Sequence, residues 1–551
     1  MSSPSRSTSE QPAATHAQNR TEVFAVHGAD PEVLAYAMAK YSRSSLSMRQ
    51  SLRELNSQRA EQFLNTFYFQ YGHRSIADLA HVAFAVERLS LMAAIVLVDE
   101  QRWDGQERST RYQNFLKSGW YLPEFGADDE ARQLYSDTVE HLFEAYAHTS
   151  AEVLKALKAR VACPAEMPPD AYERALKARA FDVARYLLPL ATNTSLGQIV
   201  NARTLETQVS RLLSHPAAEI RDLGDKLRQA AIGPAWNLYA EPNAALHAKI
   251  AALEAKADAK FESQFGTDPV TDLAAEAEPL LLREVRVAPT LVKYAQANSY
   301  EIQTRAELAQ AAEELLAGVP IAPAPLVDLV ERTEPLEVEL AATLLYSVGH
   351  HSYRQIRDLV AGMPAARVAE TIELGARHRG RHDELLRAFH VGAVLRFDIL
   401  MDIGGFRDMH RHRRCTQILQ DFTQVHGYET PLAADLGGDT DILAEAGIGA
   451  EFRGAAETAF AASRQVAQSS APEAAQSALY LLPLATRIRA LFKMDLAEAI
   501  YISELRSAPA GHFSYRKVAW EMYLAVQRQH PSLAQYFRVT DFTQPIDILK
   551  R

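Results

Sequence analysis

The sequence predicts an α/β (α+β) protein, helix-rich overall, that consists of two diverged copies of one unit. Long amphipathic helices dominate the pattern of apolar residues. Two short apolar stretches, His81–Glu87 and Phe397–Leu400, are typical of strands. The heptapeptide YLLPLAT occurs at Tyr186–Thr192 and again, letter for letter, at Tyr480–Thr486, and a repeated segment indicates a repeated unit.

Composition narrows the class of protein. The chain has 551 residues, of which 48% are hydrophobic and 23% charged, as expected for a globular protein of several domains. Its two cysteines, Cys163 and Cys415, exclude a disulfide framework and a cysteine-rich zinc site, and they fit a cytoplasmic setting. The net charge of −11 argues against a nucleic-acid binder, and no apolar run is long enough to predict a membrane span.

The domain organisation follows from composition and from the repeat. Residues 1–20 are rich in Ser, Gln and Ala and predict a disordered tail rather than a secretory signal. Residues 21–265 form the first predicted copy. Residues 266–284 are acidic and turn-rich, which predicts a linker, and residues 285–551 form the second copy.

The elements can be predicted in order along the first copy. Asp30 and Pro31 are typical of a helix start, and a second helix is expected at about 49–70. After the strand at His81–Glu87, Leu91–Val98 is apolar on all sides and predicts a buried helix. Each copy of YLLPLAT is expected to end one helical stretch and precede another. The long helices are expected at about 128–160, 170–188, 203–230 and 236–260.

The segment Gln106–Tyr112 carries the strongest local chemical pattern. In an extended chain, Glu107, Ser109 and Arg111 lie on one side and Tyr112 on the other. A guanidinium beside a hydroxyl suits a phosphate monoester. The alternative is a helix surface on which Glu107 and Arg111 form an ordinary ion pair.

The first copy resembles the flavin-dependent (alternative) thymidylate synthases, which carry GHxSxxE and then RHRxxSxNExSxRY. The residues that match are Gly72, His73, Ser75 and Asp78 (Asp for Glu) in the first motif, and Glu107, Ser109, Arg111 and Tyr112 in ExSxRY. Later segments match ARxxLP at Ala184–Pro189, NARSL at Asn201–Leu205 and the closing helix at Arg211–Arg221. Four motifs in the family's order make the resemblance specific.

The two copies depart from the family in complementary ways. Where the family has RHR, the first copy has Asp99-Glu100-Gln101, and Asp104 replaces the family's serine. The second copy has RHRxxS as Arg411–Thr416, with Thr for Ser, but lacks ExSxRY. Because the family's sites lie where subunits of a homotetramer meet, the resemblance implies composite sites built by both copies, and a homodimer of this chain.

The resemblance implies an FAD-dependent methyltransferase of nucleotide biosynthesis, a thymidylate synthase. It would convert dUMP into dTMP with 5,10-methylenetetrahydrofolate as carbon donor and NADPH or NADH as reductant. Glu107, Ser109 and Arg111 would bind substrate, and Arg185 and Arg211 would bind substrate and act in catalysis. The cofactor-binding residues it implies are Ser42, His73, Ser75, Asp78, Asn201, Arg203, His215, Arg411, His412 and Arg413.

Three other readings stay open. The complementary losses also fit a catalytically degenerate nucleotide- or flavin-binding paralogue, and the altered positions fit a family member that acts on another pyrimidine nucleotide. Among the remaining motifs, the basic segment Arg377–His382 has two interpretations. It could bind polyphosphate, or it could be a solvated loop. His378 and His382 have the spacing of a helical metal pair, but Gly380 between them opposes a helix, so no metal site is predicted. Gly349–Ser352 looks like a second GHxS element and is taken as a chance match.

Overall fold

The computed structural model describes most of the chain and divides it into two compact units. The first unit comprises Met1–Ala80 and Pro234–Thr290, and the second comprises His81–Gly233 and Leu291–Arg551. Each unit is described by itself. The described residues are 28–40, 74–100, 102–261, 269–298, 325–330, 335–346, 359–376, 395–431 and 441–549, with isolated positions between them.

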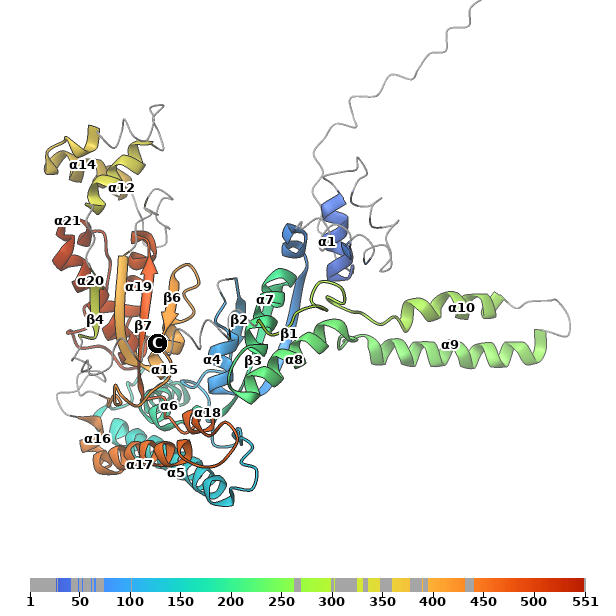
Figure 1. Ribbon diagram of the computed structural model, residues 1–551, viewed down its shortest axis with the longest axis horizontal. Helices are drawn as coiled ribbons and strands as arrows, with labels where there is room; N and C mark the ends of the chain where they lie inside the picture. The colour runs from blue at the N-terminus through green and yellow to red at the C-terminus, as the bar shows by residue number, and fades with distance from the viewer. Residues whose placement is uncertain are drawn as a thin grey trace, which may run out of the picture. The chain divides into compact units, whose positions relative to one another are not determined.

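The first unit is helical in its described residues. It contains α1 (Pro31–Lys40), the 3-10 helix η3 (Arg74–Leu79), α9 (Ala240–Phe261) and α10 (Pro269–Leu281). Helices α9 and α10 pack against each other as a hairpin (Figure 1). The stretch expected as a linker at 266–284 therefore contains a helix, because its alanines and leucines outweigh the turn residues at its start.

The first copy contributes a three-stranded antiparallel sheet to the second unit. Its strands are β1 (His81–Ser90), β2 (Asp104–Glu107) and β3 (Asn193–Asn201), in the order β1-β3-β2. Its helices are α4 (Leu91–Leu97), α5 (Asp129–Arg160), α6 (Pro169–Ala184), η4 (Arg185–Leu187), α7 (Ala202–Leu213) and α8 (Ala218–Ile232).

The second copy repeats this sheet and adds one strand at its edge. Its strands are β4 (Val327–Val330), β5 (Leu395–Asp402), β6 (Thr416–Leu419) and β7 (Arg487–Met494), in the order β4-β5-β7-β6. Its helices are α12 (Leu336–Tyr346), α14 (Ala365–Ala376), α15 (Ile403–Met409), α16 (Ile442–Glu445), α17 (Gly449–Ala467), α18 (Ala474–Leu479), α19 (Leu496–Ser507), α20 (Phe513–Gln529) and α21 (Pro531–Ala534).

The strand register is the same in both sheets. Ser90 pairs with Asn193 in the first sheet, and Asp402 pairs with Arg487 in the second. On the other side of the central strand, Asp104 pairs with Ile199 and Thr416 pairs with Lys493. Thr416 follows Asp402 by as many residues as Asp104 follows Ser90, so β2 and β6 are equivalent. The two diverged copies predicted from the sequence are therefore two copies of one fold.

In each copy, a side chain caps the helix that follows the first strand. The capping side chain also forms a hydrogen bond to an equivalent residue in each copy. The Ser90 hydroxyl caps α4 by accepting from the Ala93 amide at 2.9 Å, and it donates to Glu219 at 2.7 Å. Asp402 caps α15 in the same way and accepts from the Ser514 hydroxyl. The hydroxyl and the carboxylate have exchanged places between the copies, so the hydrogen bond persists while both residues differ.

The two YLLPLAT segments pair with each other. The Leu190 and Ala191 amides donate to the carbonyls of Leu482 and Tyr480, each at 2.9 Å. The equivalent bonds run in the opposite sense, from Leu484 to Leu188 at 2.9 Å and from Ala485 to Tyr186 at 3.0 Å. Pro189 and Pro483 face each other at the centre of this antiparallel bridge. Such reciprocity is typical of a two-fold axis, here an approximate one within a single chain.

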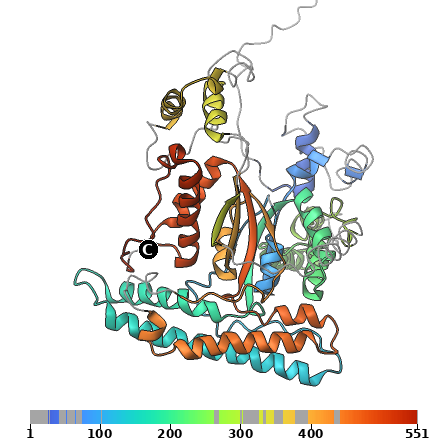
Figure 2. The ribbon, with the colours of Figure 1, turned by 60° about the vertical axis from the view of Figure 1, so that its left-hand side comes forward.

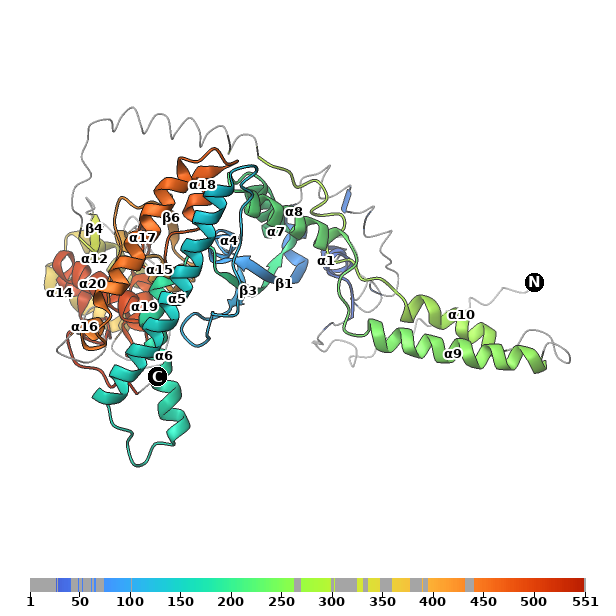
Figure 3. The same ribbon diagram turned by 90° about the horizontal axis from the view of Figure 1, so that it is seen from below.

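Long helices from the two copies pack together beside this bridge. Helices α5 and α17 lie side by side (Figures 2 and 3). Arg160 at the end of α5 pairs with Glu445 at 2.5 Å, and His148 of α5 lies 2.9 Å from Glu451 of α17. The copies therefore share one packed unit rather than forming two separate ones. None of the helices in the described parts of the chain combines the length and apolar character that crossing a membrane requires.

Several local predictions are confirmed and others are wrong. The strands at His81–Glu87 and Phe397–Leu400 and the buried helix after Ser90 all exist. The helix expected at 203–230 is two helices, because Pro216 lies in the turn between α7 and α8. YLLPLAT precedes a strand in each copy rather than a helix. In β3, the alternate burial of Thr194, Leu196, Gln198 and Val200 is a period-two pattern that favours a strand.

The bridge between the repeats makes a symmetric prediction. Ala191→Pro removes the donor to Tyr480, and Ala485→Pro removes the donor to Tyr186, so each leaves a buried carbonyl unpaired at a cost of about 1–3 kcal/mol. We expect similar losses of unfolding free energy in urea. Ala191→Gly and Ala485→Gly keep the amide and serve as controls. Proline variants as stable as the glycine variants would show that the bridge does not hold the copies together.

Candidate functional site

The segment Gln106–Tyr112 is extended only in its first part. Strand β2 ends at Glu107, and the chain then turns so that Arg111 is buried while Tyr112 is 57% exposed. Arg111 and Tyr112 thus point to opposite environments, as expected. The helical alternative does not occur, because Glu107 lies in β2, and Glu107 pairs with Arg407 of α15 instead of with Arg111. The ExSxRY segment of the first copy is therefore held by the second copy.

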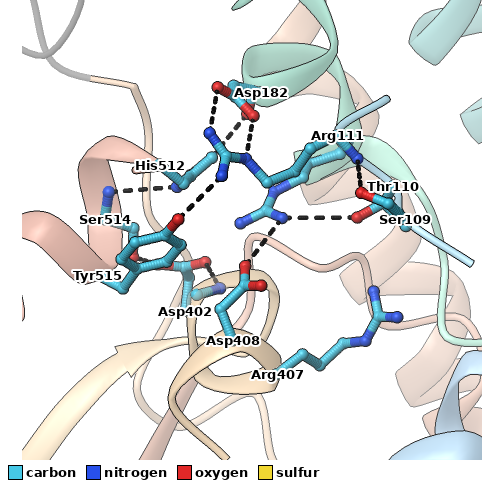
Figure 4. A network of polar contacts seen from close by, with 12 residues as sticks. Ser109, Thr110, Arg111, Asp182, Asp402, Arg407, Asp408, His512, Ser514 and Tyr515 are labelled. Atoms are coloured by element: carbon cyan, nitrogen blue, oxygen red, sulfur yellow. Dashed lines mark hydrogen bonds and ion pairs between the residues drawn. The ribbon is translucent and has the colours of Figure 1, made fainter. Parts of the chain in front are cut away.

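Arg111 donates hydrogen bonds to residues of both copies (Figure 4). Its Nε and Nη2 atoms donate to the two carboxylate oxygens of Asp182, at 2.7 and 3.1 Å. Its Nη1 donates to the Tyr515 hydroxyl at 2.8 Å, and Nη2 also donates to the Ala510 carbonyl at 3.1 Å. Burial opposes the charge, but Asp182 outweighs it and raises the pKa of Arg111. An internal carboxylate therefore occupies the fork predicted to bind phosphate.

Asp408 of α15 is the anion around which four arginines gather. Burial opposes its ionisation, but Arg185, Arg411, Arg111 and Arg506 together lower its pKa. Arg185 Nη1 lies 3.3 Å from Asp408, and the same nitrogen reaches Thr110 Oγ1 at 3.5 Å. Arg185 is 1% exposed, and its Nε and Nη2 atoms have no hydrogen-bond partner among the described residues. The cluster thus has more buried cationic donors than its own carboxylates satisfy.

A cleft lies near this cluster, and both copies line it. It consists of two cavities, of about 220 and 630 Å³, that share Asp99, Arg211 and His410. The smaller is polar and is also lined by Glu100, Thr207, His412, Arg413, Cys415, Thr416 and Gln417. The larger has an apolar part lined by Met92, Ile95, Val96, Leu419, Phe422 and Leu479. The complementary motif losses predict such a composite cleft.

The three consecutive residues of the RHR motif have different surroundings. Arg411 is exposed and contributes to the low pKa of Asp408. His412 is buried, and its Nε2 accepts from Arg506 Nε at 2.8 Å, while burial lowers its pKa. Arg413 lines the smaller cavity with its guanidinium 5.1 Å from the Trp103 ring. Burial lowers the pKa of Arg413 to about 10, and its Nε and Nη2 have no hydrogen-bond partner in the described part of the chain.

Arg211 is held by the acidic segment that replaces RHR in the first copy. Its Nη2 and Nε lie 2.8 and 3.1 Å from the same oxygen of Glu100, and Nη1 donates to the Val96 carbonyl at 2.9 Å. Burial raises the pKa of Glu100, although Arg211 opposes this. The carboxylate therefore neutralises a cation that the resemblance assigns to substrate.

The other predicted residues lie in the second unit, in the first unit or outside the described part of the chain. Asn201 caps α7 by accepting from the Thr204 amide at 2.8 Å, Arg203 is exposed, and His215 lines the larger cavity, where its Nδ1 accepts from the Ala217 amide. Ser109 Oγ accepts from the Arg111 amide at 3.2 Å. Ser75 and Asp78 lie in η3 of the other unit. Ser42 and His73, and the candidate segments Gly349–Ser352 and Arg377–His382, lie outside the described residues.

Sequence reasoning missed the groups that hold the predicted residues in place. They are Asp182, Arg407, Asp408 and His410. Asp182 carries a signal, because a carboxylate inside the apolar run Ala180–Ala184 must find a buried cation. Within the described residues, no three His, Cys, Asp or Glu side chains gather closely enough to hold a metal ion.

Comparison with known proteins gives a family and full-length relatives. Residues 25–233 and 328–532 match the family described as thymidylate synthase complementing protein. A UPF0159 protein of Chlamydia pneumoniae is 26% identical over 553 residues, covering 95% of this chain and 92% of the relative. One of Chlamydia muridarum is 28% identical, covering 93% and 91%. A flavin-dependent thymidylate synthase of Clostridium tetani is 24% identical over 212 residues, covering 38% of this chain and 81% of that protein.

The pair formed by Arg111 and Asp182 should dominate the stability of the site. Asp182→Asn leaves the Arg111 charge buried without its counterion, which costs about 3–5 kcal/mol. Asp170→Asn on the same helix is the control, because Asp170 pairs with Arg174 at the surface and should change stability little. Urea unfolding of both variants measures the difference. Equal stabilities would mean that the buried pair contributes nothing.

Proposed function

Since the chain belongs to the flavin-dependent thymidylate synthase family, we propose that it is an FAD-dependent methyltransferase that converts dUMP into dTMP. The carbon donor would be 5,10-methylenetetrahydrofolate and the reductant NADPH. The observation that carries the proposal is the cleft in which Arg413 and His412 of one copy meet Arg211 of the other. Neither copy alone supplies these residues.

The residues of the cleft fit a flavin dinucleotide. The two Arg413 donor atoms that have no hydrogen-bond partner among the described residues would donate to a phosphate oxygen, with Thr416 beside them. The apolar lining of Met92, Ile95 and Phe422 would receive a ring. When bound, the flavin supplies the hydride chemistry. Ser42, His73, Ser75, Asp78, Asn201, Arg203, His215 and Arg411 belong to the proposed cofactor-binding set as well.

The proposed substrate residues are Glu107, Ser109, Arg111, Arg185 and Arg211. Arg185 is the strongest among them, because two of its buried donor atoms have no hydrogen-bond partner in the described chain. Negative charge on a bound nucleotide would be stabilised there. Arg111 would need to exchange part of its bonding to Asp182 for a phosphate. The proposal includes a homodimer of this chain in the cytoplasm.

A second candidate is a nucleotide- or flavin-binding protein without catalysis. The observation that favours it is the state of Arg111, whose hydrogen bonds to Asp182, Tyr515 and Ala510 use four of its five N–H donors. Action on another pyrimidine nucleotide is a variant of the first candidate. Asp78, Asp104 and Thr416, which differ from the family motif, support that variant.

Genetic complementation separates the two candidates. We expect the full-length gene to let a thymidine-requiring bacterial strain grow without thymidine. An Arg185→Ala variant should abolish that growth, because it removes the buried cation assigned to substrate. Absence of growth by a wild-type protein that is folded and binds flavin would favour the non-catalytic candidate.

Flavin binding tests the cleft directly. The purified protein should be yellow, and dUMP should change its flavin absorbance spectrum. Arg413→Ala should weaken FAD binding roughly 10- to 150-fold, the loss of a charge-assisted hydrogen bond of about 1.5–3 kcal/mol. Arg414→Ala is the matched control, because Arg414 pairs with Asp495 at the surface. Equal FAD affinities of the two variants would show that Arg413 does not bind FAD.

A further inference from the structure

His410 lies where the two cavities of the cleft meet, since it lines both. It precedes the RHR motif and belongs to none of the motifs that carry the resemblance. Its ring stacks on Phe406, with centroids 4.9 Å apart, and its side chain is 5% exposed. A buried imidazole that lines both cavities is a group that a bound ligand would meet.

The hydrogen bonds around His410 determine which ring nitrogen carries the proton. Gln417 Nε2 donates to the His412 carbonyl at 2.9 Å, which fixes the orientation of the Gln417 amide. Its Oε1 then lies 2.7 Å from His410 Nδ1, and an oxygen acceptor requires a proton on that nitrogen. In the neutral ring, Nε2 therefore has a lone pair. Nε2 is buried and makes no hydrogen bond within the described residues.

Charged groups face this ring from both copies. Asp99, after α4, has an oxygen 3.6 Å from Nε2, and its side chain is 54% exposed. Arg211 of α7 and Arg413, after α15, act on the ring as cations. Burial and Arg413 lower the pKa of His410, Asp99 raises it, and Arg211 lowers it further. Burial and the two cations thus outweigh Asp99 and the hydrogen bond to Gln417, so the pKa of His410 lies below its ordinary value.

We propose that His410 is a further ligand-binding residue, which takes up one proton at Nε2 when the diphosphate of a dinucleotide binds beside Arg413. The anion cancels the repulsion that Arg413 exerts on the ring. The proton comes from solvent, and the imidazolium then donates from Nε2 toward the diphosphate or Asp99. Nothing is oxidised or reduced. The inference rests on the proposed function for its choice of ligand.

Proton uptake by His410 would make the affinity for the dinucleotide depend on pH. If binding takes up a proton, affinity rises as pH falls, over the interval between the pKa of His410 in the complex and its lower pKa in the free protein. One linked proton gives up to about a tenfold rise in affinity per pH unit. FAD is a suitable probe, because its diphosphate diester does not titrate in this interval.

The experiment is calorimetric titration of FAD into the full-length protein from which flavin has been removed. Repeating it at pH 6.5 in buffers of different ionisation enthalpy counts the protons taken up. We expect net proton uptake, of up to one proton, for the wild type and close to none for His410→Asn, which keeps a donor toward Gln417. His148→Asn on the surface of α5 is the matched control and should behave as the wild type does. ADP-ribose, with the same diphosphate, should show the same uptake.

Asp99→Asn is a second variant that tests the role of His410. Because the Asp99 side chain is partly exposed, the fold should tolerate this substitution. It removes an anion that repels the diphosphate and favours the imidazolium. We therefore expect tighter FAD binding at pH 8 together with fewer protons taken up at pH 6.5. A merely structural role for Asp99 would not produce these two opposite changes.

The outcomes separate this inference from the proposed function. FAD binding without proton uptake, or uptake that persists in His410→Asn, overturns the role of His410 and leaves the proposed function intact. Absence of FAD and ADP-ribose binding at every pH overturns both.

Discussion

The antiparallel pairing of the two YLLPLAT segments is the constraint on which the geometry of the second unit depends. Its bonds run reciprocally between Tyr186–Thr192 and Tyr480–Thr486, so they relate the two sheets by an approximate two-fold axis. Because the loops after α4 and α15 are equivalent in the two copies, the same relation brings both to one cleft. Asp99 and Arg413 therefore line a common cavity although they lie far apart in sequence.

Duplication allows these equivalent loops to carry opposite charges. Asp99 and Glu100 occupy the positions equivalent to Arg411 and His412. Each pair follows its helix-capping residue, Ser90 or Asp402, by the same number of residues. In an assembly of identical subunits, both loops would carry the same residues, and like charges would face each other across the axis. A single chain with two copies can change one loop alone. The acidic loop of the first copy then faces a cation of the second, because Asp99 and Glu100 line the same cavity as Arg413 and act on it electrostatically.

Local patterns predicted more of the fold than of the site. Alternation and apolar runs identified β1, α4 and β5, and the repeat identified the duplication, because these signals lie within a few residues of one another. The partners of Arg111 lie 71 and 404 residues away, at Asp182 and Tyr515, and no local spacing encodes such pairings. Motif resemblance predicted that both copies would line one cleft. It did not predict Asp182 and Asp408, the carboxylates that pair with Arg111 and Arg185, since they lie outside the motifs.

These carboxylates determine at which cation an added anion can bind with the smallest cost in free energy. At Arg111, a phosphate must replace Asp182, and separating a buried ion pair costs several kcal/mol, about 3–5 in comparable pairs. At Arg413, which lines the smaller cavity, it meets donor atoms without hydrogen-bond partners among the described residues, so no protein hydrogen bond has to break first. The electrostatics of the unit therefore divide its cations into those that hold the two copies together and those on which ligand binding can act.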